Sequence, residues 1–263
     1  MVSGEQLSGL NIAMYQFFYI NSGWDNQDTC IIIPIMYALV FFVIYWFVAQ
    51  SKKIKGYFYR KYEFDSASVK HIFFTKYFGF FTLGVAPAIL CFIANPEISL
   101  ADFGFTWIRK TVFFSFVWIL GLSAVVIPLA YFSARKPKNL MNYPQIRAKI
   151  WTRRTLLINL SGWAIYLLGY EFLFRGVLLF SLYESLGIWP AIAINIALYS
   201  ATHIPKGLAE TIGAIPLGFV LCLLTLASGT IWIAFFVHVA MAWTNSLAAL
   251  KFHPDIQYKP NEK

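Results

Sequence analysis

The sequence has few charged residues for its length. Only 13% of its 263 residues are Asp, Glu, Lys or Arg, whereas 59% are hydrophobic, and the mean hydropathy is +0.63. A soluble domain has about a quarter charged residues, so this composition excludes the soluble, disordered and fibrous classes. The apolar runs are long and continuous, unlike the alternating segments of about ten residues in a membrane barrel. The sequence therefore predicts an all-α fold, a polytopic membrane helix bundle of about seven transmembrane helices.

The predicted spans divide the chain into three regions. Residues 1–150 are expected to hold N-terminal transmembrane helices and a basic loop, residues 151–250 a core of further helices, and residues 251–263 a polar tail. The twelve residues 9–20 are too few to cross a bilayer and predict an interfacial helix. The seven predicted spans are 29–50, 71–95, 111–132, 155–183, 188–203, 208–227 and 230–250.

The first 51 residues contain no Lys or Arg, and most basic residues fall in two short segments. Thirteen of the 21 basic residues lie within 51–70 and 133–154. Because cytoplasmic loops of membrane proteins carry the excess of Lys and Arg, the net charge of +9 indicates topology. We expect no nucleic-acid partner and a multi-pass protein of a bacterial inner (cytoplasmic) membrane. The N-terminus is predicted outside and the C-terminus in the cytoplasm.

Several common catalytic and metal-binding patterns are missing. The sequence has no Gly-x-Ser-x-Gly, no His-Glu-x-x-His and no Cys-x-x-Cys. Its three cysteines, Cys30, Cys91 and Cys222, are scattered in or beside apolar runs, which is typical of structural thiols. These absences argue against a serine nucleophile and a thiolate zinc site.

Ionisable residues inside the predicted spans gather in the C-terminal half. An ionisable side chain in hydrocarbon is costly unless it is paired or hydrated, so it marks a candidate functional site. Glu171 and Arg175 are four residues apart on one helix face, which favours an ion pair that serves either structure or function. His203 precedes the helix breakers of the run IPKG, and His238 lies in the last span.

Two further polar residues extend this set. Glu210 follows His203 by seven residues, and Asn245 follows His238 by two helical turns. Together, a carboxylate, two imidazoles, a guanidinium and an amide are the groups that a buried general-base hydrolase needs. Each residue alone also has a structural interpretation, as a helix-packing residue or, for Glu210, as an acid at the membrane interface. A zinc site formed by Glu171, His203 and His238 is a second possibility; otherwise no cofactor is expected.

Three short runs carry a family resemblance. The run EFLFRG from Glu171, the run YSATH ending at His203, and His238 with a downstream Asn resemble the CPBP family (CAAX protease and bacteriocin-processing enzymes, or Abi) over about 150–250. The family consists of intramembrane glutamic endopeptidases. The resemblance implies hydrolysis of a peptide bond in a membrane-anchored or C-terminally tagged protein by activated water. It implies Glu171 as general base and His203 as the residue that positions the water. His238 and Asn245 would then stabilise the oxyanion, and Arg175 would orient the carboxylate.

The sequence departs from the family pattern at two positions. Tyr170 stands where the family has the first Glu of a Glu pair, and Ala242 stands where it has an Asn after the last His. Glu171 or Glu210 then serves as the base, or the protein is catalytically silent. The alternative function is therefore a non-catalytic membrane scaffold or bacteriocin self-immunity protein that binds a peptide in the same cavity.

Overall fold

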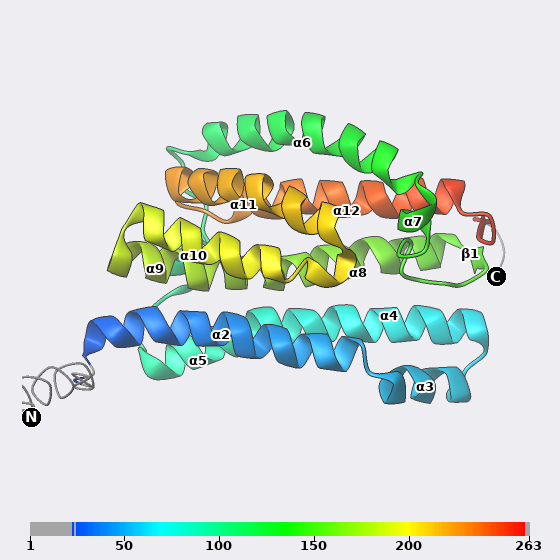
Figure 1. The fold of residues 1–263 in the computed structure, drawn as a ribbon, viewed down its shortest axis with the longest axis horizontal. Coiled ribbons are helices and arrows are strands. Elements are labelled where there is room, and N and C mark those ends of the chain that lie inside the picture. The colour runs from blue at the N-terminus through cyan, green and yellow to red at the C-terminus, as the bar shows by residue number, and fades with distance from the viewer. Residues whose placement is uncertain (1–22, 24, 261–263) are drawn as a thin grey trace, which may run out of the picture.

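The computed structural model describes residue 23 and residues 25–260, and most of them are helical (Figure 1). The predicted interfacial helix at 9–20 lies outside the described residues. The helices are α2 (Asn26–Ala49), α3 (Lys52–Lys61), α4 (Phe64–Phe80), α5 (Ala86–Ala94), α6 (Val112–Ala134), α7 (Pro137–Leu140), α8 (Arg153–Glu171), α9 (Leu179–Leu186), α10 (Ile188–Ala201), α11 (Leu208–Ser228) and α12 (Trp232–Phe252). Two π-helical stretches, η1 (Phe81–Val85) and η3 (Phe172–Leu178), join α4 to α5 and α8 to α9. Two 3₁₀ turns, η2 (Leu100–Phe103) and η4 (Ile204–Lys206), and a short parallel pair, β1 (Ile150–Trp151) with β2 (Gln257–Tyr258), complete the described fold.

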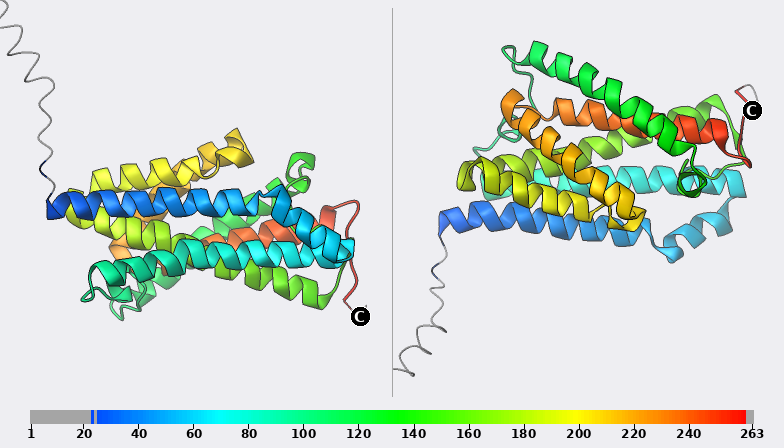
Figure 2. Two further views of the ribbon diagram at one scale, coloured as in Figure 1. Left: turned by 90° about the horizontal axis from the view of Figure 1, so that it is seen from below. Right: turned by 45° about the horizontal axis from the view of Figure 1, so that its top comes forward.

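The all-α membrane bundle predicted from the sequence is confirmed. Six helices of the described residues are long and apolar enough to cross a bilayer, and they coincide with six of the seven predicted spans. The remaining predicted span, 188–203, is α10, which has 14 residues and is therefore only about 21 Å long. This is shorter than the roughly 30 Å hydrocarbon core. Helices α10 and α11 form a hairpin, and its turn lies short of the end of the bundle that carries β1 (Figures 1 and 2).

The helix from Arg153 to Leu186 lies at the centre of the bundle. In the most hydrophobic stretch of this helix, 72% of the residues are buried. In the corresponding stretches of the helices Asn26–Lys61 and Val112–Ala134, 11% are buried. Helix α4 packs along α8 on one side, and α12 packs between α8 and α6 on the other (Figure 1). The outer helices α2 and α6 expose many apolar side chains, whereas the central helix is covered on most of its surface.

Two glycines bring the central helix into backbone contact with its neighbour. A Cβ added at Gly169 would lie 3.0 Å from the Phe80 Cα, and one at Gly84 would lie 2.9 Å from the Gly169 Cα. Small residues allow such close approach between membrane helices, where packing contributes most of the association energy. The crossing lies two residues before Glu171 and therefore fixes the position of that carboxylate.

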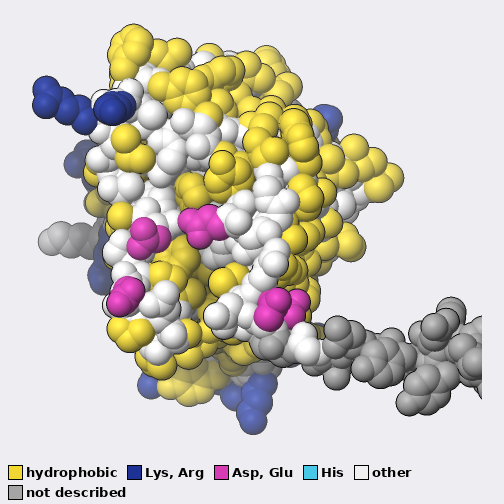
Figure 3. Space-filling model, turned by 90° about the vertical axis from the view of Figure 1, so that its left-hand side faces the viewer, with side chains coloured by type: hydrophobic (Ala, Val, Ile, Leu, Met, Phe, Trp, Pro, Cys, Tyr) yellow, Lys and Arg dark blue, Asp and Glu magenta, His cyan; other side chains and the backbone are white. Residues whose placement is uncertain are grey.

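The two ends of the bundle differ in charge. The start of α2, the α5–α6 connection and the α9–α10 turn share one end, and Figure 3 shows acidic side chains gathered on it. Asp25, Asp28, Glu97, Asp102 and Glu184 belong to these segments, with Arg109 and Lys110 as basic exceptions. The opposite end carries α3, α7 and β1, which contain or adjoin both basic segments (Figure 1).

We expect the basic end to face the cytoplasm. A fluorescent protein fused after Lys263 should fluoresce when expressed in a bacterial inner membrane, and a phosphatase fused at the same position should be inactive, because the excess of basic residues stays inside. The reciprocal activity pattern would reverse the assigned orientation.

The Gly169 crossing predicts opposite effects of the same substitution at two glycines. Gly169→Ala should lower the free energy of unfolding by about 1–3 kcal/mol because its methyl group overlaps the Phe80 backbone. Gly121→Ala is the control, since no atom lies within 4 Å of a Cβ there. Replacing a helical glycine in open space stabilises by roughly 0.5–1 kcal/mol. Thermal unfolding in detergent measures both, and equal shifts in Tm would contradict the close crossing.

Candidate active site

Four of the predicted site residues lie in the interior, on segments that the fold brings together. Glu171 ends α8 and Arg175 lies in η3, His238 lies in α12, and His203 follows α10. Glu171 and Arg175 are fully buried, and the two histidines are 6–7% exposed. The π-helical stretch begins directly after Glu171, and such widened turns occur frequently at functional sites.

The Glu171 carboxylate contacts both an imidazole and a guanidinium. Its Oε1 lies 2.5 Å from the His238 Nδ1, and its Oε2 lies 3.6 Å from the Arg175 Nε. The second distance is that of an ion pair without a hydrogen bond, and neither atom has a hydrogen-bond partner among the described residues. The ion pair predicted from the four-residue spacing is present, with His238 as an additional partner of the carboxylate.

Asn195 of α10 fixes Arg175, a role that the sequence analysis missed. The Arg175 Nη1 donates to the Asn195 Oδ1 at 3.0 Å, and the Asn195 Nδ2 donates to the Phe174 carbonyl of the π-helical stretch at 2.5 Å. The guanidinium also lies over the Tyr199 ring, 4.3 Å from its centroid. The signal in the sequence was a single amide in the apolar run IAINIALY, four residues before Tyr199.

The His203 imidazole is held by the backbone of the preceding helix, α10. Its Nδ1 lies 3.0 Å from the Tyr199 carbonyl oxygen. Because a carbonyl only accepts, Nδ1 carries the proton and Nε2 presents a lone pair. The centroid of the Tyr199 ring lies 4.9 Å from that of the His203 ring and 6.3 Å from that of the His238 ring. One aromatic side chain therefore contacts both imidazoles.

Tyr170, which stands at the departure from the family pattern, supports the turn that carries His203. Its hydroxyl lies 2.8 Å from the Thr202 Oγ1, and that oxygen lies 2.7 Å from the Tyr199 carbonyl. Since the Thr202 proton is used on the carbonyl, the Tyr170 hydroxyl is the donor to Thr202. The Tyr170 ring also meets the His238 ring edge to face at 5.8 Å.

Two predicted site residues make no hydrogen bond to this cluster. Glu210 pairs with Lys206 at 3.8 Å, and both side chains are about a third exposed. Asn245 is half-buried, lies about 10 Å along α12 from His238, and makes no hydrogen bond with the described residues. Ala242 is buried one turn after His238. The catalytic roles predicted for Glu210 and Asn245 therefore depend on how a substrate lies, and remain predictions.

No three His, Cys, Asp or Glu side chains of the described residues are grouped closely enough to hold a metal ion. The predicted alternative set of Glu171, His203 and His238 is therefore not assembled as a ligand trio. His238 contacts Glu171, whereas His203 is bonded to the Tyr199 carbonyl.

The comparisons with known proteins agree with the motif resemblance. Residues 152–244 match a family model described as type II CAAX prenyl endopeptidase Rce1-like. No curated protein matches the chain, and no solved structure matches it. The family resemblance inferred from the three runs is thus confirmed over a segment that contains Glu171, Arg175, His203 and His238.

Removing the carboxylate of the buried ion pair should destabilise the protein much more than removing that of the exposed pair. Glu171→Gln leaves the Arg175 charge buried without its counter-ion, and should lower the free energy of unfolding by about 3–5 kcal/mol. Glu210→Gln removes the same charge at an exposed i,i+4 pair and should cost less than about 1 kcal/mol.

A second substitution separates charge from shape. Glu171→Gln combined with Arg175→Met should recover part of the lost stability, because the uncompensated charge is removed. Denaturant titration in detergent measures these three variants together with Arg175→Met alone. A double variant as unstable as the sum of its single changes would contradict the charge argument.

Proposed function

Since residues 152–244 match the family model described as type II CAAX prenyl endopeptidase Rce1-like, we propose that this chain is an intramembrane endopeptidase. It would hydrolyse a peptide bond of a membrane-anchored or C-terminally tagged protein. The observation that carries the proposal is the 2.5 Å contact between Glu171 and His238, buried at the centre of the bundle inside the family segment.

The proton positions in this contact suggest how water is activated. Beside Arg175 the Glu171 carboxylate is ionised, so His238 Nδ1 carries the shared proton and its Nε2 presents a lone pair. A carboxylate that orients a histidine in this way supports a general base. Glu171 would thus act as base through His238, a refinement of the direct role implied by the family resemblance.

The reaction needs no covalent intermediate. The proton of a bound water passes to His238 Nε2 while the water oxygen attacks the peptide carbonyl carbon. His238 then returns this proton to the leaving nitrogen as the C–N bond breaks. His203 Nε2 is a second acceptor that would hold the water, and Arg175 would keep Glu171 ionised and oriented.

Two further roles in this proposal have different grounds: that of Asn245 rests on the sequence resemblance, and that of Tyr170 on its hydrogen bond to Thr202. The Asn245 amide would donate to the oxyanion of a substrate that lies along α12. Tyr170 would act indirectly, because its hydroxyl holds Thr202 and with it the turn before His203. We propose no cofactor.

The experiment compares terminal peptides of cells with and without the protein, followed by cleavage assays on the membrane-anchored substrates found. Glu171→Gln, His203→Ala and His238→Ala should each lower the rate by about 10²–10⁴-fold per folded molecule. Asn245→Ala should lower it by about 10²–10³-fold if its amide serves the oxyanion. Glu210→Gln, whose side chain is partly exposed, is the matched control and should retain the rate.

The outcomes separate the readings that the sequence left open. Loss of rate in Glu210→Gln with full rate in Glu171→Gln would move the base to Glu210. Equal restoration of the cellular phenotype by wild type and all site variants would overturn catalysis and leave a peptide-binding scaffold. The fraction of folded protein in each preparation is measured by size exclusion, because Glu171→Gln also weakens the fold.

A further inference from the structure

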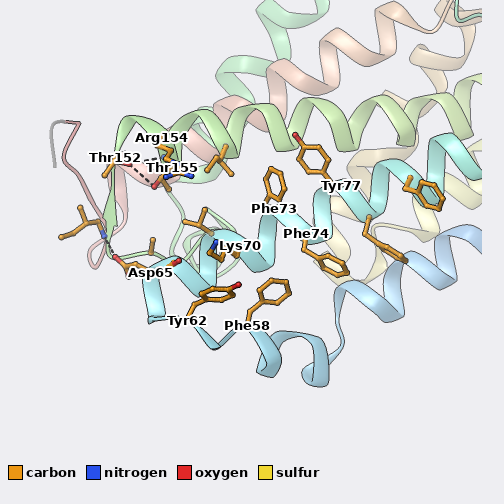
Figure 4. A pocket seen from close by; sticks show the side chains of 17 residues that line it. Phe58, Tyr62, Asp65, Lys70, Phe73, Phe74, Tyr77, Thr152, Arg154 and Thr155 are labelled. Atoms are coloured by element: carbon orange, nitrogen blue, oxygen red, sulfur yellow. Dashed lines mark hydrogen bonds between the residues drawn. The ribbon is translucent and has the colours of Figure 1, made fainter. Parts of the chain in front are cut away.

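A large groove lies outside the catalytic cluster. It has a volume of about 1050 Å³ and opens between α3, α4 and the first turns of α8 (Figure 4). None of Glu171, Arg175, His203 and His238 lines it. It begins at the end of the bundle that carries α3 and β1 and follows α4 toward the middle.

The groove has its charged side chains at one end and aromatic side chains along its whole length. Asp65, Lys70 and Arg154 surround the end next to α3 and β1, and Phe73 and Tyr77 follow along α4 (Figure 4). This distribution fits a ligand with a charged head and a hydrocarbon tail.

The charge at the polar end is positive. The Asp65 carboxylate accepts hydrogen bonds from the backbone N–H groups of Lys149 and Ile150, at 2.9 and 3.1 Å, so it serves the β1 segment. Lys70 and Arg154 are exposed, and neither has an ion-pair partner among the described residues. The Lys70 ammonium lies over the Tyr62 ring at 4.6 Å, which leaves its charge available to an anion.

The length of the groove matches one leaflet of a bilayer. Ser66 and Phe81 are fifteen positions apart on a continuous helical segment, which corresponds to about 22 Å. Half of a roughly 30 Å hydrocarbon core and one headgroup layer together measure about 21 Å. A lipid with its headgroup at Lys70 and Arg154 would therefore extend its chains along Phe73, Tyr77 and Phe81.

We propose that the groove between α3, α4 and α8 binds an anionic phospholipid of the leaflet at the basic end of the bundle. The phosphate and acidic headgroup contact Lys70 and Arg154, and one acyl chain follows the aromatic side chains of α4. This site is independent of the proposed peptidase reaction, and its test requires no substrate.

The full-length protein is reconstituted in nanodiscs that contain equal amounts of phosphatidylglycerol and phosphatidylcholine, and retained lipids are identified by native mass spectrometry. Wild type should retain phosphatidylglycerol in preference to phosphatidylcholine. Lys70→Glu with Arg154→Glu should reduce this preference by about 30-fold. Each basic residue near an anionic surface strengthens binding by about fivefold, and the double variant loses two of them. Lys52→Glu with Lys53→Glu, on the same membrane face but outside the groove, is the charge-matched control and should retain the preference.

A third variant tests the groove itself. Ser66→Trp places bulk at the exposed polar end and should lower retention of both phospholipids about tenfold. Equal loss in the two double variants would assign the preference to general surface charge and overturn the proposal. No preference in wild type, unchanged retention in Ser66→Trp, or a retained lipid that is not a phospholipid would overturn it as well.

Discussion

The buried Glu171 carboxylate is the constraint on which the rest of the interior depends. A fully buried charge must be compensated, and compensation here comes from Arg175 on the same helix and from His238 on α12. Arg175 in turn requires Asn195 of α10 and the face of Tyr199. One carboxylate therefore organises three helical segments, and the two histidines receive their positions from the same arrangement.

This arrangement needs helices that approach more closely than large side chains allow. Gly169 and Gly84 let α8 and the η1 stretch touch backbone to backbone, and a Cβ at Gly218 would lie 3.0 Å from the Tyr199 ring. The π-helical η3 stretch then carries Arg175 and accepts the Asn195 amide at the Phe174 carbonyl. Small residues and a widened turn together make room for a polar cluster that lipid-exposed helices cannot hold.

The sequence predicted the spans well because long apolar runs have one stable solution in a bilayer. It also identified the Glu171–Arg175 pair, since a four-residue spacing on a helix defines a common face. It did not predict the 2.5 Å contact of Glu171 with His238, or the Asn195 link, because these are pairings between helices. Helical periodicity shows which face of one helix is polar but not which residue of another helix meets it. For the same reason, the sequence did not predict that Glu210 and Asn245 make no hydrogen bond to the Glu171 cluster.

The central helix carries residues of both the polar cluster around Glu171 and the groove beside α4. Arg154 at the polar end of the groove and Glu171 are seventeen residues apart, about 25 Å along the helix. A headgroup held at Arg154 would therefore set the depth of the carboxylate in the bilayer. The short α10 has a complementary effect. In the turn that follows α10, His203 is 7% exposed and the next residue, Ile204, is 64% exposed. The chain therefore passes from the interior to the surface within one residue.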